Sequence, residues 1–156
     1  MADDVGSTFE IDLSGAEELL SQARDQYEDL SPLMRSLSEI IVSGVEDNFA
    51  AERGPNGPWA ELAPETIEER KEIDKWPGPI LQRSGQLIAS VQPFNTDSTA
   101  GASTNKTYAA IHQAGGTSDM PPGPAGVPAR PYMYISDDTE TEIEEEVDDF
   151  NEKAWE

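Results

Sequence analysis

Residues 31–53 read SPLMRSLSEIIVSGVEDNFAAER, and this stretch carries the strongest structural pattern in the chain. Its apolar residues recur three and four positions apart, which predicts one long helix with a core-facing stripe. The stripe consists of Leu33, Leu37, Ile40, Ile41, Val45 and Phe49. Ser31 and Pro32 predict the start of the helix, as its N-cap and its first-turn proline. Because acids lie between these apolar residues, the pattern favours a folded core with an acidic skin.

The segments before this helix predict a second helix and a strand. Ser14 and Glu17 stand at the spacing of a capping box, so a helix is expected to run from there to about Leu30. One face of that helix collects Leu19, Leu20, Ala23 and Tyr27. Residues 8–13, TFEIDL, alternate apolar and polar side chains, and residues 1–13 are therefore expected to form an N-terminal arm or strand.

Beyond the long helix, turn-rich breaks separate short elements. Prolines and glycines interrupt the chain at 54–58 and 76–79 and fill a loop at 115–129. The elements expected between these breaks are a charged helix at 64–75, an apolar helical or turn segment at 80–91 that leads into a strand, a small-residue strand at 99–104 and a helix at 108–114.

The C-terminal part predicts a strand and an acidic helix. Residues 130–135 alternate Tyr132 and Tyr134 against their neighbours, which is typical of a final strand. Ser136 or Asp137 is expected to cap the last helix, within an acidic helix and tail at 137–156. The apolar stripe of that helix is Ile143, Val147 and Phe150.

The order of these elements indicates an α+β fold. Helices come first, including the long one, then a small, mostly antiparallel sheet, then the acidic C-terminal helix. The strands and helices do not alternate as a parallel sheet requires. We expect residues 1–156 to form a single domain.

The charge balance narrows the classes of function. The chain has 156 residues, of which 32 are acidic and 10 basic, so its formal net charge is −22. Such a surface argues against binding to nucleic-acid backbones or anionic membranes, and neither a membrane span nor a secretory signal is expected. Disorder, nucleic-acid mimicry and adaptation to molar salt each explain an acidic surplus. The patterned core favours adaptation to salt.

No catalytic, cofactor or metal site stands out. The chain has no cysteine and one histidine, His112. Ser103, Thr104, Thr107 and Ser118 are conceivable nucleophiles beside that histidine, but a general base also needs an orienting partner. A lone histidine on an apolar segment is more often a core residue. The acidic run at 140–149 lacks the calcium-loop pattern and is interpreted as a solvated helix face. Arg130, between two prolines, is expected to find a carboxylate on its own chain or on a neighbouring subunit.

Four segments, in order, resemble the phage virion morphogenesis proteins. The first, at 49–71, has phenylalanine, a proline–glycine turn, Trp59, Leu62 and Thr66; the second has Ile80-Leu81 and then Ser84, Gly85, Leu87 and Ser90. The third is Tyr108 and Ala109 followed by Ile111, His112, Gln113 and Gly115. The fourth is Val127, Pro128, Ala129, Arg130, Pro131 and Tyr132. Together they cover roughly residues 35–150.

This resemblance implies a non-enzymatic virion protein. It implies a tail-completion or neck subunit that forms a ring at the head-proximal end of the tail and joins the tail to the head. A hexamer is favoured and a dodecamer is the alternative. The motif residues are expected to matter for structure or for interfaces.

The implied partners are further copies of the chain, other neck proteins (a connector or adaptor, a tail terminator or a tail tube), and genomic DNA that passes through the lumen without specific binding. The chain would be assembled in the host cytoplasm and would reside in the virion neck. Combined with the acidic surplus, the resemblance suggests a virus of a halophilic archaeon. The rival hypotheses are an assembly factor absent from the finished particle and a hydrolase that uses His112.

Overall fold

The computed structural model describes residues 14–154, and the strand expected at residues 8–13 lies outside that range. The elements in order are α1 (Ser14–Glu28), α2 (Ser31–Ala51), β1 (Arg53–Gly54), β2 (Gly57–Pro58), α3 (Pro64–Glu72), the 3-10 turn η1 (Ile88–Ser90), β3 (Gln92–Asn95), β4 (Ala100–Ser103), α4 (Ala109–Ala114), the 3-10 turn η2 (Pro124–Gly126) and α5 (Asp137–Lys153). The fold is α+β, as the sequence predicts. None of the helices described here combines the length and apolar character needed to span a bilayer.

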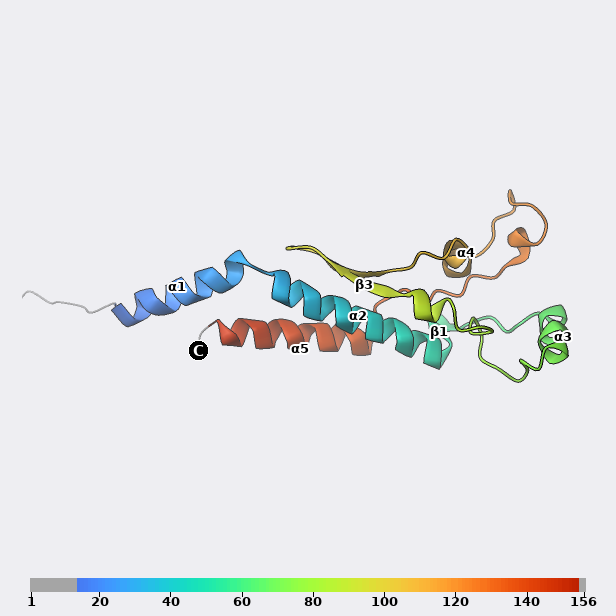
Figure 1. Cartoon of the computed structure of the whole chain (residues 1–156), viewed down its shortest axis with the longest axis horizontal. Coiled ribbons are helices and arrows are strands. Elements are labelled where there is room, and N and C mark those ends of the chain that lie inside the picture. Colours follow the sequence, from blue (N-terminus) through green and yellow to red (C-terminus); the bar gives the residue numbers. More distant parts are fainter. Residues whose placement is uncertain (1–13, 155–156) are drawn as a thin grey trace, which may run out of the picture.

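The long helix α2 is the central layer of an elongated molecule (Figure 1). Helix α5 packs antiparallel along one side of it, and the β3–β4 hairpin lies along the other side. The hairpin pairs Phe94 with Gly101 and Asn95 with Ala100. A second antiparallel pair, β1–β2, turns the chain directly after α2. The expected small antiparallel sheet is therefore two separate two-stranded ladders.

Helices α2 and α5 approach each other closely where Gly44 faces Thr139. A Cβ added at Gly44 would lie 2.3 Å from Oγ1 of Thr139 and 2.7 Å from its Cγ2. Thr139 is held in place because Ser136, the N-cap of α5, accepts its N–H through Oγ at 3.2 Å. The sequence named Ser136 or Asp137 as the cap, and Ser136 takes that role. The absence of a side chain at Gly44 lets the two helices meet.

The core lies at the C-terminal half of α2, between this helix and the segments that cross it. Phe49 is its centre: its ring meets Trp59 edge-on, with 5.6 Å between centroids, and Tyr132 at 5.1 Å. The buried cluster comprises Val45, Phe49, Trp59, Leu87, Val91, Ala109 and Tyr132. The apolar stripe predicted for residues 31–53 faces this core through Val45 and Phe49.

Helix α1 extends beyond the α2–α5 pair (Figure 1). Its last turn is tied to the end of α5, because Tyr27 Oη donates to Asn151 Oδ1 at 2.9 Å and Gln26 donates to the Phe150 carbonyl. Leu20, from the predicted apolar face of α1, is 61% exposed. Part of this apolar face is therefore uncovered in the single chain.

Two predictions about local structure are wrong. Ser31 is not the N-cap of α2: Leu30 occupies that position, and the Asp29 carboxylate accepts the Ser31 N–H at 3.0 Å. This acidic side chain supplies the acceptor that the serine was expected to provide. Residues 130–135 form no strand, since side chains from elsewhere in the fold bind their backbone.

Candidate functional site

Side chains, instead of a neighbouring strand, hold the backbone from Tyr132 to Tyr134. Gln113 Oε1 accepts the N–H groups of Tyr132 and Met133, both at 3.0 Å, and Gln113 Nε2 donates to the Met133 carbonyl at 3.1 Å. Asn48 Nδ2 donates to the carbonyls of Tyr132 and Tyr134 at 2.9 and 3.0 Å. These bonds satisfy groups that a strand partner would otherwise bind, so this irregular segment, which bends at Met133 and Tyr134, is stable without a ladder.

The same segment is anchored in the core by two aromatic residues. Trp59 Nε1 donates to the Pro131 carbonyl at 2.8 Å, and Tyr132 Oη donates to the Ala109 carbonyl at 3.3 Å. Burial, followed by the nearby Tyr108, raises the pKa of the Tyr132 hydroxyl. That hydroxyl therefore remains a neutral donor at physiological pH.

Arg130 joins three parts of the chain. Its Nε donates to the Ala60 carbonyl and its Nη2 to the Glu61 carbonyl, both at 2.8 Å, while its backbone N–H donates to the His112 carbonyl at 2.7 Å. The residue is 6% exposed. The expectation of an intrachain carboxylate partner is wrong within residues 14–154, because main-chain carbonyls take that place. Burial, then the charge of Arg70, lowers the pKa of the Arg130 guanidinium.

Arg70 is a second buried arginine in the same region. Its Nη1 donates to the Pro79 carbonyl at 2.8 Å, which ties α3 to the break after it. The residue is 4% exposed, and its Nε finds no partner among the described residues. Burial lowers the pKa of the Arg70 guanidinium, the nearby Arg83 lowers it further, and Glu52 opposes them.

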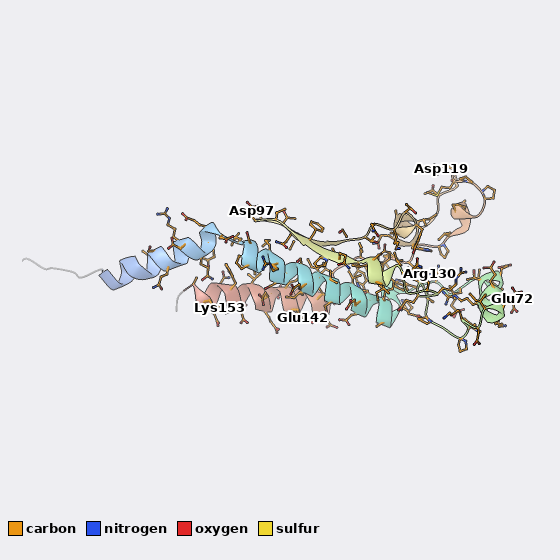
Figure 2. The ribbon with its side chains drawn as sticks, in the orientation of Figure 1. Glu72, Asp97, Asp119, Arg130, Glu142 and Lys153 are labelled. Carbon is orange, nitrogen blue, oxygen red and sulfur yellow. The ribbon has the colours of Figure 1, made fainter. Side chains whose placement is uncertain are left out.

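A cleft of about 890 Å³ opens over these arginines. Arg70, Arg83 and Arg130 supply its cationic lining, and Glu61 is the one acid among the described residues that line it. The apolar lining includes Leu62, Leu81, Leu87 and Val127. Figure 2 shows Arg130 on the side of the molecule that carries Glu72 of α3, away from Lys153 at the end of α5. The cleft is thus a cationic site in a chain of net charge −22.

His112 lines this cleft without a partner for its Nδ1 among the described residues. Burial and then the charge of Arg130 lower the pKa of its imidazole, so the ring is neutral near pH 7. Tyr108 meets the ring edge-on at 6.0 Å. In residues 14–154 no hydrogen bond joins the His112 ring to a hydroxyl or a carboxylate; Thr104, one of the conceivable nucleophiles, is instead 2.6 Å from Ser90 Oγ.

Two glycines of the motifs occupy left-handed conformations. Gly85 has φ of +70° and Gly115 has φ of +79°. A Cβ at Gly115 would lie 2.8 Å from the Ala129 nitrogen, so the two ends of the loop at 115–129 pack against each other. Gly116 adds a backbone hydrogen bond to the Val127 carbonyl at 2.8 Å. The loop is therefore closed at its base.

All but one of the predicted motif residues fall into four structural groups. Those in the core are Trp59, Leu87 and Tyr132, and those that bind backbone groups through their side chains include Gln113 and Arg130. The positions that line the cleft are Leu62, Thr66, Tyr108, His112 and Pro128. Gly85 and Gly115 form turns, and Pro131 packs against Gly54. The motifs thus converge around the cleft and the core beneath it.

Sequence reasoning did not single out Asn48 or Arg70. Asn48 carries a usable signal, because it follows Val45 by three positions on the buried side of α2, where a polar residue needs a partner. Arg70 carries none, since its neighbours in α3 are also charged. No group of three or more acids and histidines among residues 14–154 is arranged to hold a metal ion.

Comparison with known proteins identifies the family of the chain. A model of the phage virion morphogenesis family matches residues 11–150. The chain is 37% identical to the putative capsid assembly protein G of Escherichia phage Mu over 111 residues, which cover 70% of this chain and 71% of the relative. It is 30% identical over 145 residues to the Mu-like prophage FluMu G protein 2 of Haemophilus influenzae, covering 91% and 95% of the two chains. No solved structure matches it.

Proposed function

Because the chain belongs to the phage virion morphogenesis family and is thus a phage structural or assembly protein, we propose that it is a ring-forming tail-completion or neck subunit. In this role it joins the tail to the portal or connector of the head. It acts by binding other subunits, not as an enzyme. It is assembled in the host cytoplasm and remains in the neck of the finished particle.

The observation that carries the proposal is the distribution of uncovered surface over an elongated subunit. Leu20 is exposed on α1, which forms one end of the molecule (Figure 1). Trp76, which follows α3, and Tyr108, which precedes α4, are also exposed, and these two helices lie toward the other end. Phe94 of the β3–β4 hairpin is 45% exposed between them. Different surfaces at opposite ends suit a head-to-tail contact, which generates a closed ring when the rotation between subunits closes.

Three motif residues, together with Asn48, support a rigid subunit. Gln113, Asn48 and Trp59 bind backbone groups of residues 131–134, and Arg130 binds carbonyls of residues 60 and 61. These side chains fix the path of irregular segments that no strand or helix would hold. A ring subunit needs such fixed segments, because its contacts must have the same geometry in every copy.

The ring is proposed to be a hexamer, with a dodecamer as the alternative. Its further partners are the connector or adaptor and the tail terminator or tail tube. Genomic DNA passes through the lumen without specific binding. The net charge of −22 supports this last point, because a surface of the same sign as DNA discourages adhesion.

We also propose that the virus infects a halophilic archaeon. The acids of α5 at positions 140, 144, 145, 148 and 149 are exposed, and buried residues underlie the acidic surface. A folded chain with this charge tolerates self-repulsion best where salt screens it, since the screening length falls to about 3 Å at 1 M.

Mass spectrometry of purified virions, together with a cryo-electron microscopy map of the neck, tests the role. The chain should be present at ring stoichiometry, and the map should place it between portal and tail. The name of the phage Mu relative, a putative capsid assembly protein, favours a second candidate: an assembly factor that leaves the particle. Absence from intact virions, with defective particles when the gene is deleted, would establish that alternative.

A further inference from the structure

We propose that the cationic cleft binds residues 8–13 of a neighbouring copy of the chain. Glu10 and Asp12 of this segment, TFEIDL, pair with the cleft arginines, while Phe9 and Ile11 pack on its apolar lining. This inference rests on the proposed ring and supplies one of its subunit contacts. It assigns the same cleft as acceptor in every copy.

The charge of the cleft is opposite to that of the chain. Three of the ten basic residues, Arg70, Arg83 and Arg130, line it together with one acid, Glu61. Among the side chains that the structure describes, ion pairs join only Arg24 to Glu28 and Lys71 to Glu68, so none of the three cleft arginines is paired with a carboxylate there. Neighbouring guanidinium groups repel each other, and the charge of Glu52 partly offsets this repulsion at Arg70. An incoming carboxylate would relieve the repulsion that remains.

The arginines also retain donors that a ligand can use. The hydrogen bonds of the buried pair use Nη1 of Arg70 and Nε and Nη2 of Arg130. Nη2 of Arg70 and Nη1 of Arg130 form no hydrogen bond within the described residues and are not among the fully buried unpartnered atoms. Their N–H groups are therefore not fully buried, although both residues are buried overall, and Arg83 is exposed among the lining residues. Arg70 Nε and His112 Nδ1, both buried without a partner, mark a region whose polar groups are incompletely satisfied.

The pattern of residues 8–13 matches the mixed lining of the cleft. An extended segment directs successive side chains to opposite sides, so its acids and its apolar residues form separate rows. Arginines and leucines line the cleft together, which offers a surface for each row. The exposed side of α5 is the rival donor, but it is a convex helix surface made almost wholly of acids.

The distance along the molecule requires the donor to be another copy. Phe9 precedes Ser14 by five residues, which span at most about 18 Å when fully extended. Ser14 begins α1, which leads into α2, and the helices α3 and α4, which contribute Arg70 and His112 to the cleft, lie toward the far end of α2 (Figure 1). A helix as long as α2 alone extends about 31 Å, from its 21 residues at about 1.5 Å each. A segment that reaches this cleft must therefore come from a neighbour.

The test is sedimentation velocity of the full chain over a range of protein concentrations at constant salt. Arg83→Glu reverses the charge of the acceptor at an exposed side chain, and Glu10→Arg with Asp12→Arg reverses the donor. The acceptor variant and the donor variant should each raise the midpoint, the protein concentration at which half of the chains are assembled, by about tenfold or more. Combining the acceptor and donor changes should return the midpoint to within about threefold of the wild type.

Arg35→Glu is the matched control, because Arg35 is exposed on α2 and does not line the cleft. It should leave the midpoint unchanged. The inference is overturned if donor reversal has no effect, if the combined variant assembles no better than the single sets, or if Arg35→Glu acts as strongly as Arg83→Glu. It is also overturned if a peptide of α5 residues inhibits assembly and a peptide of residues 6–15 does not. If all variants still form an intact ring, the proposed contact at the cleft is contradicted, but the proposed role in the neck is not.

Discussion

Gln113 binds the backbone of Met133 as a neighbouring strand would. Its Oε1 accepts the Met133 N–H at 3.0 Å, and its Nε2 donates to the Met133 carbonyl at 3.1 Å. The same oxygen accepts the N–H of Tyr132. One amide side chain therefore replaces the main-chain ladder at this point, and only an amide provides both the donor and the acceptors.

Gln113→Glu should destabilise the fold by about 1–3 kcal/mol. The glutamate keeps the acceptor oxygen, but it loses the donor and places a second oxygen against the Met133 carbonyl. Urea unfolding followed by circular dichroism measures this loss. Gln86→Glu is the control, because that glutamine is exposed and its side chain forms no hydrogen bond in the described part of the chain. Equal stability of the two variants would contradict the role of Gln113.

Asn48→Ala should cost about 2–4 kcal/mol, since the carbonyls of Tyr132 and Tyr134 both lose a donor. Thermal unfolding of this variant and of Asn105→Ala, an exposed asparagine in the chain segment before α4, gives the comparison. The loss should be much larger at position 48. A shift below about 0.5 kcal/mol there would mean that water satisfies the carbonyls equally well.

Gly44→Ala should destabilise the packing of α2 on α5 by about 1–3 kcal/mol, because the new methyl group overlaps Thr139. Adding Thr139→Ala removes both overlapping atoms, Oγ1 and Cγ2, so the double variant should lose less than the sum of the single losses. Gly126→Ala is the control, with open space around its Cβ position. Strictly additive losses in the Gly44–Thr139 cycle would exclude a direct clash.

Lowering the pH should destabilise the wild type more than His112→Gln. Burial and Arg130 lower the pKa of His112 in the folded chain. As the pH falls below about 6.5, the ordinary value, the unfolded chain binds a proton that the folded chain resists, and stability is lost. Urea midpoints at pH 7, 6 and 5 should diverge between the two proteins. Both proteins carry the same carboxylates, so protonation of these groups affects them equally. If their urea midpoints fall in parallel as the pH is lowered, the lowered pKa of His112 is contradicted.

Molar potassium chloride should raise the melting temperature. The charge of −22 repels itself in the compact state, and salt screens this repulsion. Replacing the exposed Glu144 and Asp148 of α5 by glutamine and asparagine should lower the salt concentration needed. A melting temperature that stays constant from low to molar salt would count against adaptation to a saline host.

The long helix and the irregular segment at 130–135 show which structural features a local sequence pattern can predict and which it cannot. The apolar stripe of α2 is a local signal, since residues three and four apart share a face of one helix. The helix is confirmed; Leu33, Leu37, Val45 and Phe49 of the stripe are buried, and Ile40 and Ile41 are half-buried. The alternation at 130–135 predicted an extended backbone but could not identify what binds it. The partners, Asn48 and Gln113, lie 19 to 86 residues away in the sequence.

The cationic cleft was beyond sequence reasoning for the same reason. The motifs brought attention to Arg130, but Arg70 and Arg83 come from different segments and meet it only in the folded chain. The carbonyl partners of Arg130 also leave no trace in the sequence, because every residue carries a carbonyl. Side-chain chemistry alone favoured a carboxylate partner.

The closed base of the loop at 115–129 separates its interior from the rest of the chain. Gly115 and Ala129 hold the two strands of chain together at that point, and Asp119 lies at the outer part of the loop in Figure 2. Because the ends are fixed, added residues cost only a small closure entropy, which grows slowly with loop length. A short epitope inserted beside Asp119 should therefore leave the stability of the fold nearly unchanged. It could be used to label individual copies of the chain inside an assembled particle.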